Sequence, residues 1–160
     1  MSNPFDDIRA LLANMPALDG AALAQARARE AQLTKPAGSL GRLEEIAEFL
    51  AAWQGGAPHV ENPLVAVFAG NHGVAARGVS PYPSSVTEAM VGNFQAGGAA
   101  INQICKSFNL SLKVYELALA QPTGDITVEP AMDERACAAT MAFGMEALAG
   151  NPDLLCLGEM

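Results

Sequence analysis

The sequence predicts an α/β fold in which helices cover a parallel β-sheet, and three observations support this. Short apolar runs bounded by turn residues occur at 64–69, 112–117 and 153–158. Longer segments with helical spacing lie between them, at 84–108 and 130–149. Hydrophobic residues make up 51% of the chain but aromatic residues only 6%, which favours closely packed small side chains over an aromatic-cored β-sandwich. The length of 160 residues is enough for a domain with its own core.

The first 54 residues are predicted to be helical. Within residues 1–33, apolar positions at helical spacing fall on both sides of a break at 16–20, so we expect two short helices. Residues 35–38 form a turn, after which Ser39 can cap a third helix. The apolar stripe expected to pack in this helix comprises Leu40, Leu43, Ile46, Ala47, Leu50 and Trp53.

The rest of the chain alternates strands and helices. The run 64–69 lies between Pro63 and Gly70 and predicts a strand covered on both faces. In 84–108, Ser85-x-x-Glu88 has the form of a capping box, and Gly97-Gly98 is expected to divide the helix into two. An Ala- and Met-rich helix is expected at 130–149 before the third strand. Because no helix follows that strand, we expect either a fragment or a fold completed by another chain.

Charge and cysteine content exclude several classes of function. The formal net charge is −8, from nine basic and seventeen acidic residues, and no basic patch is visible, so nucleic acid is not an expected partner. No apolar run approaches about 18 residues, which argues against a membrane span. The acidic N-terminal segment lacks the pattern of a secretory signal, so we expect a cytoplasmic protein. Three dispersed cysteines, expected to be buried thiols, and two histidines predict no metal site.

Candidate binding residues follow the first and third strands, because open parallel sheets bind ligands beyond the carboxyl ends of their strands. Asn71 and His72 lie between two glycines after the first strand, and Glu159 follows the third. Each also has a simpler interpretation. His72 can be a turn residue, Glu159 a surface carboxylate, and Ser80-Pro81-Tyr82-Pro83 a rigid extended loop.

Several ordered motifs together resemble one enzyme family. They are Lys35-Pro-Ala-Gly-Ser-Leu-Gly-Arg-Leu-Glu44, Val67-Phe-Ala-Gly-Asn-His-Gly-Val-Ala75, Gly78-Val-Ser-Pro-Tyr-Pro83, Ala96-Gly-Gly-Ala-Ala-Ile-Asn102 and Gly158-Glu-Met160. This pattern resembles the nicotinate-nucleotide–dimethylbenzimidazole phosphoribosyltransferases of the cobalamin lower-ligand pathway.

The resemblance implies transfer of phosphoribosyl from nicotinate mononucleotide to 5,6-dimethylbenzimidazole, giving α-ribazole 5′-phosphate and nicotinate. It also implies a homodimer that needs no metal or organic cofactor. Each subunit would have a three-layer Rossmann-like domain and a small helical domain. On this basis we assign residues 1–33 to the small domain and 34–160 to the N-terminal portion of the Rossmann-like domain.

Family members are about twice as long, and the glutamate regarded as their general base lies beyond residue 160. The chain is therefore expected to be the N-terminal half, with little or no activity alone. Its catalytic residues cannot be assigned from this half.

For the substrate site, we expect Ser80, Tyr82 and Met90 to flank the benzimidazole, with Asn71 and His72 at the floor. Glu159 would lie toward the ribose, since it matches the glutamate that opens a family segment implied to hold the ribose phosphate.

The chain departs from the family pattern at two of these places. Many members have aspartate at the position of Asn71, and a glutamine common near the start of the following helix is replaced by Glu88 or Ala89. Two other functions stay open: a non-catalytic benzimidazole-binding or scaffolding domain, and a structural subunit completed by another polypeptide.

Overall fold

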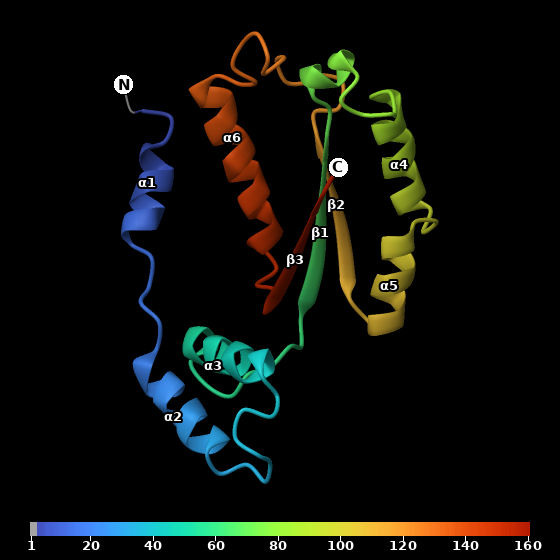
Figure 1. Cartoon of the computed structure of the whole chain (residues 1–160). Coiled ribbons are helices and arrows are strands. Elements are labelled where there is room, and N and C mark those ends of the chain that lie inside the picture. The colour runs from blue at the N-terminus through green and yellow to red at the C-terminus, as the bar shows by residue number, and fades with distance from the viewer. Residues whose placement is uncertain (1–2) are drawn as a thin grey trace. The chain divides into compact units, whose positions relative to one another are not determined.

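The computed structural model describes residues 3–160 and contains helices and three strands (Figure 1). The chain forms two compact units, one from Leu11 to Val60 and the other from Glu61 to Met160 together with the stretch up to Ala10. In chain order the elements are α1 (Asp6–Ala13), α2 (Gly20–Glu30), α3 (Arg42–Gln54), β1 (Pro63–Gly70), the 3-10 helix η1 (Gly73–Arg77), α4 (Ser85–Gln95), α5 (Ala100–Phe108), β2 (Ser111–Leu117), α6 (Glu134–Met145), the 3-10 helix η2 (Glu146–Leu148) and β3 (Leu154–Glu159).

The three strands form one parallel sheet in the order β2-β1-β3. β1 is central, and its Val67 pairs in register with Val114 of β2 and Gly158 of β3. The predicted α/β fold and all three predicted strands are confirmed. Since all three strands run in the same direction, their carboxyl ends share one edge of the sheet (Figure 1).

Helices cover both faces of this sheet, as Figure 1 shows, with α4 and α5 on one side and α6 on the other. On the α4–α5 side, buried Val65, Val67 and Cys105 form the core, with partly buried Phe94, Ile101, Leu110, Leu112 and Val114 packed against them. On the α6 side, Phe68 stacks on Tyr115 with ring centroids 5.0 Å apart, and Phe143 of α6 meets Tyr115 edge-on at 6.1 Å. Alternation of side chains along β1 therefore supplies both cores, and the predicted three-layer arrangement is confirmed.

The break between α4 and α5 falls at the predicted glycine pair. Gly97 has a φ of 76°, and a Cβ on Gly98 would lie 2.2 Å from Oδ1 of Asn93. The left-handed backbone of Gly97 therefore favours glycine, whereas a side chain at position 98 would require the Asn93 side chain to move. The predicted capping box is wrong, because Ser84 is the N-cap residue and makes no side-chain capping bond. Its backbone is itself helical, and the turn is closed by Val86 N–H donating to Pro83 O at 3.0 Å.

In the Leu11–Val60 unit, α2 and α3 pack through small residues. Asp19 caps α2, its Oδ1 accepting from the amides of Ala21 and Ala22 at 2.8 and 2.9 Å. The Asp19 amide in turn donates to Ala52 O at 2.8 Å, and Ala51 and Ala52 are buried. Small side chains let helix backbones approach closely, so these alanines form the contact face of α3.

Two predictions for α3 are wrong. The stripe expected to pack contains four residues that are at least 44% exposed, Leu40, Leu43, Ile46 and Trp53. The burial is provided instead by the alanine face. The helix also begins at Arg42 with Gly41 as its N-cap, at a φ of 55°, so Ser39 does not cap it.

An ion-pair network ties α2 to the start of α3. Lys35 Nζ contacts the carboxylates of Glu30 and Glu44, the latter at 2.6 Å, and Leu40 N–H donates to Glu44 at 3.0 Å. Hydrogen bonds to Glu30 and Glu44 raise the pKa of Lys35. The hydrogen bond from Lys35, followed by that from the Leu40 amide, lowers the pKa of Glu44. Both carboxylates that pair with Lys35 therefore belong to the same unit as Lys35.

Candidate functional site

The exits of β1 and β3 lie side by side. Met160 N–H donates to Phe68 O at 3.0 Å, and Gly70 N–H donates to Met160 O at 2.9 Å. β2 ends at the same edge, since Gly70 is in register with Leu117. The sequences after all three strands therefore meet at the edge where parallel sheets bind ligands.

A first hollow of about 440 Å³ lies at the exits of β1 and β2. Its walls come from the turn after β1, the start of α4 and the end of β2 with the loop that follows: Asn71, Ser84, Ser85, Glu88, Glu116, Ala118, Leu119, Ala120 and Gln121. This lining contains two carboxylates and no lysine or arginine. Such a hollow can accept hydrogen bonds from the N–H groups of a neutral ligand, and it disfavours an anion.

Asn71 is the predicted site residue that this hollow contains. Its Nδ2 donates to Leu119 O at 2.9 Å, so the amide group is held by the loop after β2. Ser84 and Glu88 approach the same space from the start of α4, where Pro83 ends the preceding loop. The first hollow thus brings Asn71 together with Glu88, which lies near the position where many family members have glutamine.

A second hollow, of about 530 Å³, lies beside β3 and is mostly apolar. Met90, Phe94, Ile101, Ile104 and Leu110 line it from α4, α5 and the loop that follows, together with β1 residues and Cys156–Met160. Of the predicted site residues it contains Met90 and Glu159. Glu159 is in register with Phe68, which lies on the α6 face, so the two side chains share that face. Met90 and the Glu159 carboxylate therefore do not converge in this chain alone.

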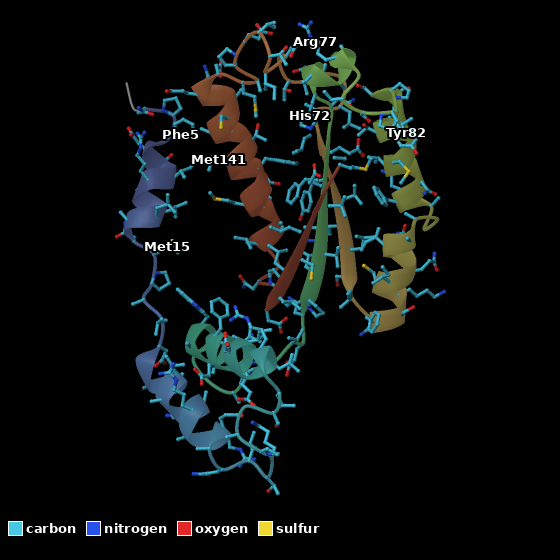
Figure 2. All side chains as sticks on the ribbon, in the orientation of Figure 1. Phe5, Met15, His72, Arg77, Tyr82 and Met141 are labelled. Carbon is cyan, nitrogen blue, oxygen red and sulfur yellow. The ribbon has the colours of Figure 1, made fainter. Side chains whose placement is uncertain are left out.

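His72, Ser80 and Tyr82 line neither hollow. His72 is exposed and forms a bridge with Thr123, at the end of the sheet where β1 exits (Figure 2). Tyr82 is 68% exposed beside α4, and its amide donates to Ser80 Oγ at 3.2 Å. That bond closes a local turn, and residues 80–82 bend instead of forming the extended loop that the prolines predicted. A binding role for these three residues stays a prediction.

The sequence interpretation missed the loop after β2. Leu119 holds Asn71, Thr123 N–H donates to Asn71 O at 3.1 Å, and Gly73 N–H donates to Thr123 O at 3.0 Å. The strand prediction at 112–117 contained the signal, because the rule that ligands bind at strand exits applies to β2 as well. The loop after β2 carries no recognised motif, but the predicted strand at 112–117 already places it at the ligand-binding edge of the sheet.

The cysteines differ in burial, which corrects the expectation of three buried thiols. Cys105 is buried, Cys137 is partly buried and Cys156 is exposed. Burial raises the pKa of the Cys105 thiol, and proximity to Cys156 adds to the effect. Within residues 3–160 no group of three or more His, Cys, Asp or Glu side chains could hold a metal ion. Over the same residues, every helix is too short or too polar for a membrane span.

Comparison with known proteins yields a consistent set of relatives. A family profile described as phosphoribosyltransferase matches residues 15–160. Proteins named nicotinate-nucleotide–dimethylbenzimidazole phosphoribosyltransferase from Allorhizobium ampelinum and a Sinorhizobium species are 69% and 70% identical over 157 residues. A crystal structure of such an enzyme from Thermus thermophilus is similar with a TM-score of 0.80 and 39% identity, covering 89% of this chain and 49% of that one. The alignments cover 98% of this chain but 46% of the first two relatives, so it spans about half their length.

Proposed function

Because this chain belongs to the nicotinate-nucleotide–dimethylbenzimidazole phosphoribosyltransferase family, we propose that it supplies the base-binding half of such an enzyme. The complete protein transfers phosphoribosyl from nicotinate mononucleotide to 5,6-dimethylbenzimidazole, giving α-ribazole 5′-phosphate and nicotinate. The observation that carries this proposal is the hollow at the exits of β1 and β2, lined by Asn71 from the motif after β1 and by Glu88 from the first turn of α4.

The charges of that hollow suit the acceptor base better than the nucleotide. A neutral benzimidazole carries one N–H, and the carboxylates of Glu88 and Glu116 are acceptors for it. Nicotinate mononucleotide carries a phosphate and a carboxylate, which the same two groups repel. We therefore place the benzimidazole in this hollow and the nucleotide outside it.

Phosphoribosyl transfer needs a group that removes a proton, and it needs the two substrates held close together. The attacking nitrogen of the benzimidazole forms a bond to the anomeric carbon of the ribose as the bond to nicotinate breaks, and the N–H proton must leave. A carboxylate within hydrogen-bond reach can take that proton. Holding the two substrates together accounts for several kcal/mol of the barrier, about 7–11 in favourable cases. As the family resemblance implies, we assign removal of the proton to a group in the half of the relatives that this chain does not cover, and we assign to Glu88 and Glu116 the binding of the base before that transfer.

The proposed function also extends to the oligomeric state and the cellular location of the protein. We propose a cytoplasmic homodimer. Exposed apolar side chains on α3, among them Leu43 at 62% and Phe49 at 61%, support an association surface in the Leu11–Val60 unit. Sedimentation measurements on the full-length protein test this, and a monomer at micromolar concentration would contradict it.

Turnover assays test the function directly. The 160-residue chain and a version extended to the length of its relatives are supplied with nicotinate mononucleotide and dimethylbenzimidazole, and α-ribazole phosphate is measured by chromatography. We expect product from the extended protein and little or none from the short chain. Glu88→Ala should lower kcat/KM in the extended protein, whereas Glu146→Ala, in the 3-10 helix that precedes β3, should not. An extended protein that binds the base and makes no product would favour a non-catalytic base-binding domain.

A further inference from the structure

The connection from β2 to α6 folds back over the turn that leaves β1. Residues 118–133 contain no helix or strand, yet they lie against residues 71–73 at the carboxyl edge of the sheet (Figure 1). Three hydrogen bonds hold them there: Asn71 Nδ2 to Leu119 O at 2.9 Å, Thr123 N to Asn71 O at 3.1 Å and Gly73 N to Thr123 O at 3.0 Å. We call residues 119–131 the strap. It fixes the backbone on both sides of His72.

The contact is too close for a side chain between the two backbones. A Cβ on Gly73 would lie 2.5 Å from Thr123 O and 2.9 Å from Asp125 N. Real Cβ atoms do not approach other atoms so closely, so only glycine permits the contact. Within the strap itself, Gly124 N–H donates to Ala131 O at 2.8 Å, which closes the segment into a loop. The strap is thus one ordered piece pressed onto the β1 turn.

An ion pair holds the strap at its outer end. Arg77, the last residue of η1, donates from Nε to Asp125 Oδ2 at 2.6 Å. The other oxygen of Asp125 accepts from the Thr127 amide at 2.9 Å and from Thr127 Oγ1 at 2.7 Å. The hydrogen bonds from Thr127, followed by the one from Arg77, lower the pKa of Asp125. Its carboxylate is 16% exposed and fully engaged, which suits a structural anchor and not a proton acceptor.

We propose that Asp125 and Arg77 form a latch that positions Asn71 for the base-binding site. This inference rests on the proposed function. η1 begins directly after His72, so the latch and the three hydrogen bonds clamp the β1 turn from its two ends. Releasing the latch leaves the three bonds to hold the strap alone. The floor of the first hollow then loses its fixed position, because Asn71 and Leu119 both line it.

The test uses Asp125→Asn in the extended protein, since asparagine keeps the shape but removes the charge that pairs with Arg77. We expect kcat/KM for the benzimidazole to fall about 10- to 100-fold, mostly through KM, because small displacements of positioning groups cost this much. Arg77→Lys keeps the charge and should retain most of the activity. The matched control is Glu48→Gln, which breaks the 2.9 Å Arg27–Glu48 pair in the other unit and should leave KM unchanged.

A second readout separates this inference from the proposed function. Hydrogen exchange of the Gly73 and Thr123 amides in the 160-residue chain reports the clamp without any substrate. We expect Asp125→Asn to speed both, and Glu48→Gln to change neither. Unchanged exchange, or KM within twofold of wild type in Asp125→Asn, overturns the latch. An unmodified extended protein that neither binds the base nor turns over would overturn the proposed function and the positioning role, while exchange would still report the latch.

Discussion

The side-chain amide of Asn71 donates a 2.9 Å hydrogen bond to the carbonyl oxygen of Leu119, a residue 48 positions away. The bond joins the exits of β1 and β2 and orients one wall of the first hollow. An amide can make this donation, whereas a carboxylate in its place cannot.

Asn71→Ala should lower the free energy of unfolding by about 1 kcal/mol, the usual net contribution of an intramolecular hydrogen bond. Chemical denaturation of the 160-residue chain measures the change. Gln121→Ala is the control, because Gln121 lines the same hollow and its truncation should stay within about 0.5 kcal/mol. Equal losses in the two variants would show that the Asn71 bond contributes nothing specific.

Gly73→Ala should destabilise the chain by about 1–3 kcal/mol, because the new methyl group would collide with the Thr123 carbonyl oxygen. Gly92→Ala is its matched control. Gly92 lies inside α4 with open space where the methyl group would go, so this change should stabilise by about 0.4–1 kcal/mol. Denaturation midpoints of the two variants should therefore move in opposite directions. A stable Gly73→Ala variant would contradict the close approach of the strap.

Charge selection by the first hollow is testable with three ligands. Calorimetry on the extended protein should show benzimidazole binding more tightly than benzimidazole-5-carboxylate, by about five- to tenfold at low salt, and more tightly than 1-methylbenzimidazole, which lacks the N–H. Replacing Glu88 and Glu116 by glutamine should bring the affinity for benzimidazole-5-carboxylate closer to the affinity for benzimidazole. If the double variant discriminates as the unmodified protein does, the two carboxylates do not face the ligand.

Because of the Lys35 network, the free energy of unfolding should depend on pH in two ranges, one acidic and one alkaline. Glu44 has a pKa below its usual 4.5, so its contribution is present above pH 4.5 and is lost as the pH falls through the lowered folded value. Lys35 has a pKa above its usual 10.5, so its contribution is complete below pH 10.5 and is lost as the pH rises through the raised value. Unfolding temperatures of the unmodified chain and of the Lys35→Met variant, measured across both pH ranges, test this dependence.

Arg42→Met is the control for that measurement. It removes the exposed Arg42–Glu45 pair, which solvent screens. The control should keep the pH profile of the unmodified chain. A Lys35→Met variant with an unaltered profile would refute the assignment.

The cysteines should react with iodoacetamide in the order of their exposure. Cys156 is exposed and should be alkylated first, whereas Cys105 is buried with a raised pKa and should react only after unfolding. Peptide mapping by mass spectrometry resolves the two sites. Early labelling of Cys105 in the folded chain would mean that the core beside Val65 and Val67 opens readily.

Local patterns in the sequence determined the elements of this protein. Apolar runs of six residues gave strands within about one residue of their observed bounds, and the glycine pair at 97–98 divided the helix as predicted. Strand–helix alternation gave a parallel sheet, and the ordered motifs gave the family. Each of these features depends on residues close together in the chain, where spacing and backbone preference act directly.

Only the tertiary structure decided which groups meet. The exposed side of α3, the separation of Asn71 from Met90 into two hollows and the strap over Gly73 all depend on contacts between distant segments. Side-chain period says which residues share a face, but not what that face packs against. The Asn71–Leu119 bond arises because β1 and β2 end at the same edge, a consequence of strand order that no local pattern contains.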